Sequence, residues 1–138
     1  MRKTLFRGKS IATGKWIEGD LRTYRNGARE IIKTDIEWAD GTHDAVLFPV
    51  DPNTVVQFIN RKDKNGRMVF EKDIVKDMYG RIGVIEWHDK KSAYSFCFTK
   101  PHIENINFTC SLLNSGAMQV LEVIGNIHDN PELLEGTV

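Results

Sequence analysis

The chain has 138 residues, which is enough for one domain with a small appendage and excludes two full enzyme domains. Hydrophobic residues make up 41% and charged residues 28%, as in globular proteins and unlike disordered or collagen-like chains. Lys plus Arg number 19 and Asp plus Glu number 19, so the chain lacks the strong overall positive charge that many nucleic-acid-binding proteins carry.

Short β-strands are predicted at the N-terminus, because helical periodicity is nearly absent and β-branched and aromatic residues recur between turn signals. Strands over residues 4–7 and 16–21, joined by a turn at 12–15, predict a hairpin. The dipeptide Asn26-Gly27 precedes a further strand over 28–32 and supplies the positive φ angles that a tight hairpin turn requires.

Residues 35–53 predict an irregular connection around the short apolar run 45–48, because they contain Gly41, two prolines and four Asp. This connection is the best candidate for a boundary inside the chain. We therefore expect an N-terminal β lobe over residues 1–52 and a C-terminal region over 53–138, although both could form one compact domain.

The C-terminal region predicts a small β-barrel followed by one helical turn. A second Asn-Gly, at 65–66, predicts another hairpin. In the last strand Leu121, Val123 and Ile127 are expected to point one way and Glu122 and Asn126 the other. Asn130 as N-cap, Pro131 and Gly136 frame a helical turn over residues 132–134. The predicted strands cover residues 54–59, 67–70, 73–76, 82–87, 94–98 and 121–127.

Compartment signals favour the cytoplasm. Cys97 and Cys110 are the only cysteines, and they are typical of small buried residues rather than of a disulfide framework. No apolar run approaches the roughly 18 residues of a membrane span, and Met1-Arg2-Lys3 leads into charged sequence rather than a signal peptide.

Charge is unevenly distributed along the chain. Residues 1–69 hold 13 basic and 9 acidic residues, a net of +4, whereas residues 70–138 hold 6 and 10, a net of −4. Opposite ends of neighbouring copies could attract one another, so self-association is expected.

Six blocks in chain order resemble the YopX family of phage and prophage proteins, over nearly the whole chain. They are Phe6-Arg7-Gly8-Lys9, Lys15-Trp16-Ile17-Glu18-Gly19-Asp20-Leu21, Lys62-Asp63-Lys64-Asn65-Gly66-Arg67, Phe70-Glu71-Lys72-Asp73-Ile74-Val75, Gly83-Val84-Ile85-Glu86-Trp87 and residues 122–134. The family usually has Gly where Lys72 stands. The resemblance implies a mostly β fold with an SH3-like barrel in the C-terminal half, a phage or prophage origin, a cytoplasmic setting and homo-oligomers. It implies no established activity, so no catalytic residue is carried over.

Catalysis and metal binding find no support in the residue pattern. The four histidines are scattered singly, and Cys97 and Cys110 form no Cys-x-x-Cys pair, so neither a metal site nor a cofactor is expected. His88-Asp89 has the composition of an acid–base pair, but a polar turn at a strand end explains it better. We therefore expect a protein that is not an enzyme.

Two binding functions remain. We favour a protein-interaction module that binds a host or phage protein or another copy of itself, with Trp16, Trp38 and Trp87 as candidate interface aromatics. The alternative is nucleic-acid binding by basic N-terminal strands in which Trp16 and Tyr24 are interleaved. Basic side chains that merely keep strand edges soluble would give the same pattern. The candidate nucleic-acid-binding residues are Arg7, Lys9, Lys15, Arg22, Arg25 and Arg29.

Overall fold

The structure is a computed structural model that describes residues 2–100, 110–112 and 118–135. The described residues are mostly β, as the sequence predicts, and form antiparallel sheets. Contacts within the chain divide it into an N-terminal unit, Met1–Phe58, and a C-terminal unit, Ile59–Val138. The division lies inside strand β5 (Val56–Lys62), and the sequence-based boundary lies at residue 52.

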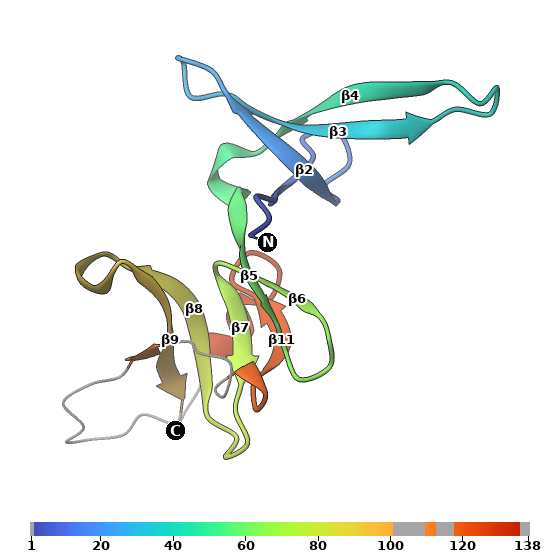
Figure 1. Ribbon diagram of the computed structural model, residues 1–138. Helices are drawn as coiled ribbons and strands as arrows, with labels where there is room; N and C mark the ends of the chain where they lie inside the picture. Colours follow the sequence, from blue (N-terminus) through green and yellow to red (C-terminus); the bar gives the residue numbers. More distant parts are fainter. Residues whose placement is uncertain (1, 101–109, 113–117, 136–138) are drawn as a thin grey trace. The chain divides into compact units, whose positions relative to one another are not determined.

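The N-terminal unit is one curled antiparallel sheet with the strand order β4-β3-β2-β1, and the start of β5 pairs with β1 (Figure 1). Its strands are β1 (Phe6–Lys9), β2 (Trp16–Thr23), β3 (Arg29–Glu37) and β4 (His43–Val50), followed by a 3₁₀ turn over Pro52–Thr54. A bridge between Ser10 and Val50 brings the end of β1 to the end of β4. Alternation along the strands then buries Ile31 and Val50 inside the curl.

The predicted irregular connection over residues 35–53 is wrong, because most of this segment is the β3–β4 hairpin. The loop-forming residues are concentrated in its turn. Gly41 has a φ of 83°, and Asp40 Oδ1 accepts hydrogen bonds from the amide and the hydroxyl of Thr42. A β-bulge between Lys33 and Ile36 lets β3 carry one more residue than β4. Asp40 and Gly41 therefore mark the tip of a hairpin.

The C-terminal unit contains a five-stranded antiparallel sheet with the order β10-β9-β8-β7-β11 and the β5–β6 hairpin (Figure 1). Ile59 of β5 and Val69 of β6 share one buried cluster with Val75, Ile85 and Phe96 of the sheet. The described strands do not close a barrel, so the SH3-like barrel stays a prediction. The strands are β6 (Met68–Phe70), β7 (Asp73–Lys76), β8 (Ile82–His88), β9 (Ala93–Lys100), β10 (Cys110–Leu112) and β11 (Glu122–Asn126), and β8 and β9 are joined by a 3₁₀ turn over Asp89–Lys91.

Four hairpin turns share one five-residue design, over residues 24–28, 38–42, 63–67 and 77–81. In each turn, the amide of the first residue donates a hydrogen bond to the carbonyl of the fifth residue. The fourth residue is a glycine, and its amide donates to the carbonyl of the first residue. The two hairpins predicted from Asn-Gly are confirmed. Gly27 and Gly66 have positive φ angles, whereas Asn26 and Asn65 do not. The turns are therefore three-residue loops in which the glycine supplies the left-handed residue.

The alternation predicted for the last strand breaks at a β-bulge between Val123 and Gly125. Leu121 and Val123 are buried as expected, but Asn126 is buried too, because the extra residue turns it inward. The predicted helical turn is confirmed as a 3₁₀ turn over Pro131–Leu134. Asn130 does not cap this turn with its side chain. Its Oδ1 instead accepts the Asn126 amide at 3.3 Å.

Gly136, predicted to end the helical turn, lies outside the described residues.

Lys72 has a φ of 66°, a left-handed conformation that costs a non-glycine residue about 1–2 kcal/mol. Its Nζ lies 3.2 Å from Glu86 Oε1, but both side chains are well exposed and such pairs contribute at most about 1 kcal/mol. We expect Lys72→Gly to raise the free energy of unfolding by about 0.5–1 kcal/mol, measured by urea denaturation. Glu86→Gln is the control, because it removes the ion pair without relieving the backbone. A less stable Lys72→Gly variant would contradict the expectation.

Candidate functional site

Trp16 and two of the predicted basic residues lie together on one face of the β1–β2 pair. Lys9 is directly opposite Trp16 in the register, and Arg7 is two residues away on the same face. The Arg7 guanidinium carbon lies 4.6 Å from the centroid of the indole ring, and Lys9 Nζ lies 5.5 Å from it. Both cations can therefore make cation–π contacts with this ring.

Arg22 lies further along β2, beside an acidic residue. It stands opposite Glu30 in the β2–β3 register, and its guanidinium carbon is 4.7 Å from the centre of the Tyr24 ring. The Tyr24 hydroxyl donates a hydrogen bond to the Glu30 carboxylate, and this bond raises the pKa of Tyr24. The positive charge of Arg22 is thus offset within the same face.

The remaining basic candidates lie elsewhere in the N-terminal unit. Arg29 pairs with Thr23, so alternation places it on the face opposite Arg22. Lys15 precedes β2, and Arg25 is in the turn between β2 and β3. The structure therefore brings Arg7, Lys9 and Trp16 together and distributes the other four over two faces and two connections.

The distal part of the β3–β4 hairpin, residues 33–46, forms an arm. The last pair between β2 and β3 joins Asp20 to Ile32, so beyond it β3 pairs only with β4 (Figure 1). Trp38 begins the turn at the tip, is 47% exposed and donates its Nε1–H to Asp44 Oδ2 at 3.2 Å. The arm presents both of its faces to solvent over most of its length.

β4 is also the end strand of the sheet among the residues that the structure describes. It carries the apolar run Ala45-Val46-Leu47-Phe48, in which Leu47 is 42% exposed. The bridge to Ser10 covers its outer edge at Val50, and the Pro49 carbonyl there accepts the amide of Ile11 at 3.0 Å. Residues 43–48 therefore form an apolar strand edge of the kind that pairs with another chain.

Of the three candidate tryptophans, Trp87 is the one that lies in the C-terminal unit. It is opposite Tyr94 in the β8–β9 register, and the two rings meet edge to face with centroids 5.1 Å apart. Tyr94 packs against the buried cluster, whereas Trp87 remains 47% exposed. Trp87 therefore extends the core to the surface at one end of β8.

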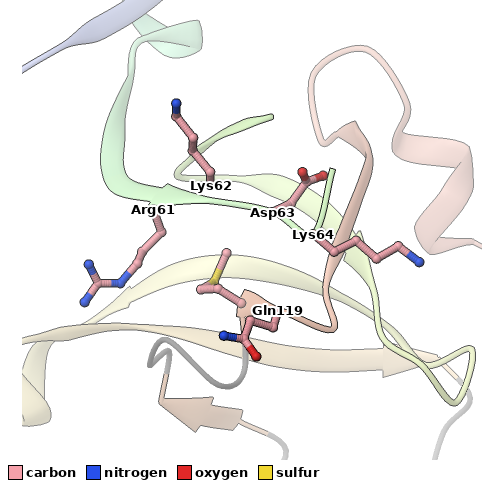
Figure 2. A pocket seen from close by; sticks show the side chains of 6 residues that line it. Arg61, Lys62, Asp63, Lys64 and Gln119 are labelled. Atoms are coloured by element: carbon pink, nitrogen blue, oxygen red, sulfur yellow. The ribbon is translucent and has the colours of Figure 1, made fainter. Parts of the chain in front are cut away.

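A pocket of about 320 Å³ lies where β5 ends in the C-terminal unit. Figure 2 shows Arg61 and Lys62 projecting to opposite sides of the strand, with Gln119 close to the same stretch. None of the predicted candidate residues lines this pocket. The available signal was the run Arg61-Lys62-Asp63-Lys64-Asn65-Gly66-Arg67, which has four basic residues in seven. The residues that line the pocket are Arg61, Lys62, Asp63, Lys64, Met118 and Gln119.

Asp63 does not act as a free acid in this pocket. It is 6% exposed, its Oδ1 accepts the amides of Asn65 and Arg67, and its Oδ2 accepts the amide of Val123, all at 2.9 Å. Burial raises the pKa of Asp63, but these three amides and the charge of Arg67 lower it by more, so the pKa lies below its ordinary value. Asp63 is therefore an ionised structural group.

No group of three or more His, Cys, Asp or Glu is placed to hold a metal ion within the described ranges. None of the helices in the described part of the chain has the length and apolar content needed to cross a bilayer. Cys97 and Cys110 are partners in the β9–β10 register, and the prediction that their side chains are buried falls outside what the structure describes.

Comparison with known proteins identifies a family and solved structures that are similar to this chain. The model of the family described as "YopX protein" matches residues 5–135. The crystal structure of protein EF1440 from Enterococcus faecalis is 22% identical in sequence, with a TM-score of 0.55, over 98% of this chain and 100% of that one. At this identity the likeness shows the fold alone. No curated protein matches the chain.

Proposed function

We propose that this chain, which belongs to the YopX family, is a non-enzymatic phage or prophage accessory protein that forms homo-oligomers and binds a host or phage protein. Its setting in this proposal is the host cytoplasm. The observation that carries the proposal is the exposed β3–β4 arm with its apolar edge strand. The SH3-like barrel in the C-terminal half is part of the same proposal, supported by the bond from the Lys64 amide to the Leu121 carbonyl, which ties the β5–β6 turn to the start of β11.

The arm supports association because a two-stranded hairpin with both faces in water is only marginally stable by itself. Pairing along residues 43–48 would satisfy the outer edge of β4 and bury Leu47. Pro49 stops such pairing at its own position, because it has no amide to donate. The segment open to pairing is thus short and defined.

The charge distribution favours a second copy of this chain as the binding partner of the arm. Residues 33–46 contain four acidic residues and one Lys, a net of −3. Residues 1–32 contain eight basic and three acidic residues, a net of +5. The arm of one copy and the basic strands of another are therefore complementary, and association should weaken as salt screens these charges.

We expect the protein to sediment as a species larger than the monomer at micromolar concentration and low salt, and to dissociate as salt rises. Leu47→Lys should give a monomer under the same low-salt conditions, because a lysine on an edge strand opposes pairing with another chain. Sedimentation velocity measures both results.

Met78→Lys is the matched control. It makes the same kind of change at an exposed apolar residue of the C-terminal unit. A wild-type protein that is a strict monomer at low and at high salt would refute assembly, and equal effects of the two substitutions would refute the role of the β4 edge over residues 43–48.

Nucleic-acid binding by the basic N-terminal strands is the second candidate. The observation that favours it is the contact of Arg7 and Lys9 with the ring of Trp16, which would place cations beside a stacking platform. Acidic residues on the same face, among them Glu18 and Glu30, weaken the local positive charge. Protein binding therefore remains the first proposal.

A further inference from the structure

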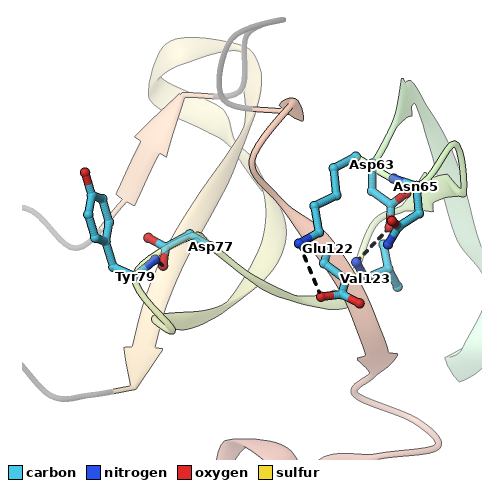
Figure 3. Close-up of polar contacts among 7 residues, drawn as sticks. Asp63, Asn65, Asp77, Tyr79, Glu122 and Val123 are labelled. Carbon is cyan, nitrogen blue, oxygen red and sulfur yellow. Dashed lines mark hydrogen bonds and ion pairs between the residues drawn. The ribbon is translucent and has the colours of Figure 1, made fainter.

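Two hairpin turns of the same sequence pattern flank the start of β11 in the C-terminal unit. Residues 63–67 and 77–81 both follow the pattern Asp-x-x-Gly-Arg. The amide of Lys64 donates to the Leu121 carbonyl at 2.9 Å, and Lys76, which precedes the second turn, is the register partner of Glu122. Figure 3 shows Asp63 on one side of Glu122 and Asp77 on the other. Both turns therefore lie at the same end of the unit.

The acidic residues of these turns are turned inward and are occupied by hydrogen bonds. Asp77 is 8% exposed and accepts the amides of Tyr79 and Arg81 as well as Arg81 Nε, in the same way that Asp63 serves its own turn. The basic residues Arg61, Lys62 and Lys64 are by contrast exposed. The two carboxylates are therefore buried, whereas the basic side chains are exposed to solvent.

The hairpin-end surface consists of these two turns with Arg61, Lys62, Lys76 and Glu122, and it carries a net charge of +3. This sum follows from six basic and three acidic residues. It stands out because residues 70–138 have a net charge of −4. One of its ion pairs joins Lys64 Nζ to Glu122 Oε2 at 3.7 Å and is well exposed, so it competes weakly with another anion.

An aromatic ring and a pocket accompany these cations. Tyr79 is 76% exposed, and the guanidinium carbon of Arg81 lies 5.2 Å from the centre of its ring. The pocket beside Lys62 and Lys64 has the buried side chain of Met118 in its wall and the exposed amide of Gln119 at its rim. Its volume of about 320 Å³ is at the lower end for small-molecule sites.

We propose that the hairpin-end surface binds single-stranded nucleic acid. The basic residues would neutralise backbone phosphates, one base would stack on Tyr79, and another would enter the pocket against Met118. A flexible single strand suits this surface, because its cations project in several directions, as Figure 2 shows for Arg61 and Lys62. This site is separate from the basic N-terminal strands and from the arm, so it stands independently of the proposed function.

The test measures the binding of the full chain to a fluorescently labelled oligothymidylate by anisotropy, over a salt series from about 50 to 200 mM. Lys62→Gln/Lys64→Gln should reduce the slope of log affinity against log salt by roughly 1.4, at about 0.7 for each lost phosphate contact on a single strand. Tyr79→Ala should weaken binding about fivefold or more.

A matched variant distinguishes this site from general charge effects. Lys90→Gln/Lys91→Gln removes the same charge from exposed residues of the same unit. This control should bind as the wild type does. Urea denaturation confirms that each variant is folded.

Four outcomes would overturn the proposal. The first is no binding near 50 mM salt, and the second is an equal loss of binding in Lys62→Gln/Lys64→Gln and in its control. The third is a loss of binding only in a variant of the basic N-terminal strands, Arg22→Glu/Arg25→Glu/Arg29→Glu. The fourth is unchanged binding by Tyr79→Ala. The last result would indicate a surface for acidic polymers or proteins in general. The oligomeric state of Leu47→Lys is measured separately and does not bear on these results.

Discussion

Replacing Asp63 by alanine is expected to lower the free energy of unfolding by about 3–5 kcal/mol. Asp63 Oδ2 accepts the buried amide of Val123, a residue 60 positions away in the chain, while Oδ1 accepts two amides of its own turn. The alanine variant leaves the Val123 amide without this acceptor in a place that water reaches poorly. It also removes one of the bonds that tie the β5–β6 turn to the start of β11, and leaves the bond from the Lys64 amide to the Leu121 carbonyl.

The second Asp-x-x-Gly-Arg turn, residues 77–81, supplies the control for this prediction. Asp77 accepts two amides and one guanidinium group from its own turn, and none of these bonds reaches another strand. Asp77→Ala is therefore expected to lower the free energy of unfolding by only about 1–2 kcal/mol, since water can solvate the turn amides. Urea denaturation followed by circular dichroism measures both variants, and equal losses would show that the Val123 bond adds nothing.

Asp63 also predicts how stability depends on pH. Its pKa is lower in the folded than in the unfolded protein, so its contribution is complete above the unfolded value of about 3.9 and is lost as pH falls through the folded value. We expect the wild type to lose stability below about pH 4, and Asp63→Asn to lose less over the same range. Parallel pH profiles for the two proteins would contradict this assignment.

Gly19→Ala is expected to lower the free energy of unfolding by about 3 kcal/mol, although it adds a single methyl group. A Cβ atom on Gly19 would collide with the carbonyl oxygen of Ile32 and would lie 3.1 Å from Cγ2 of Ile31. The backbone of β3 must therefore move away where it pairs with β2, next to the buried Ile31.

Thr23→Ala is the control for Gly19→Ala, because Thr23 is exposed on the same strand. It should change the free energy of unfolding by no more than about 0.5 kcal/mol. Chemical denaturation distinguishes the two outcomes, and a Gly19→Ala variant as stable as Thr23→Ala would show that β3 gives way freely at this point.

The sequence predicted correctly the hairpins that are determined by residues adjacent to one another in the chain. Asn26-Gly27 and Asn65-Gly66 mark hairpins because a glycine with positive φ is a local requirement. The β3–β4 arm was missed because Asp40 and Gly41 were assigned to a long connection, when they form only its turn. Local signals fix the position of a turn but not the length of the strands on either side of it.

The candidate sites show the same limit. The sequence singled out Trp16, and the register places Arg7 and Lys9 beside it, as alternation allows. It also grouped Arg22 with Arg29, which the register places on opposite faces. The hairpin-end surface was not found, because Asp63 and Lys76 come together only through β11.

By itself the sequence determined a mostly β protein, its two Asn-Gly hairpins and its resemblance to the YopX family, because strand periodicity, turn glycines and ordered blocks are properties of neighbouring residues. Tertiary structure alone decided that Asn126 is buried, that Asp63 bonds to Val123, and that two matching turns flank Glu122. These outcomes depend on a bulge and on pairings between distant strands. Their free energy comes from contacts that no local pattern contains.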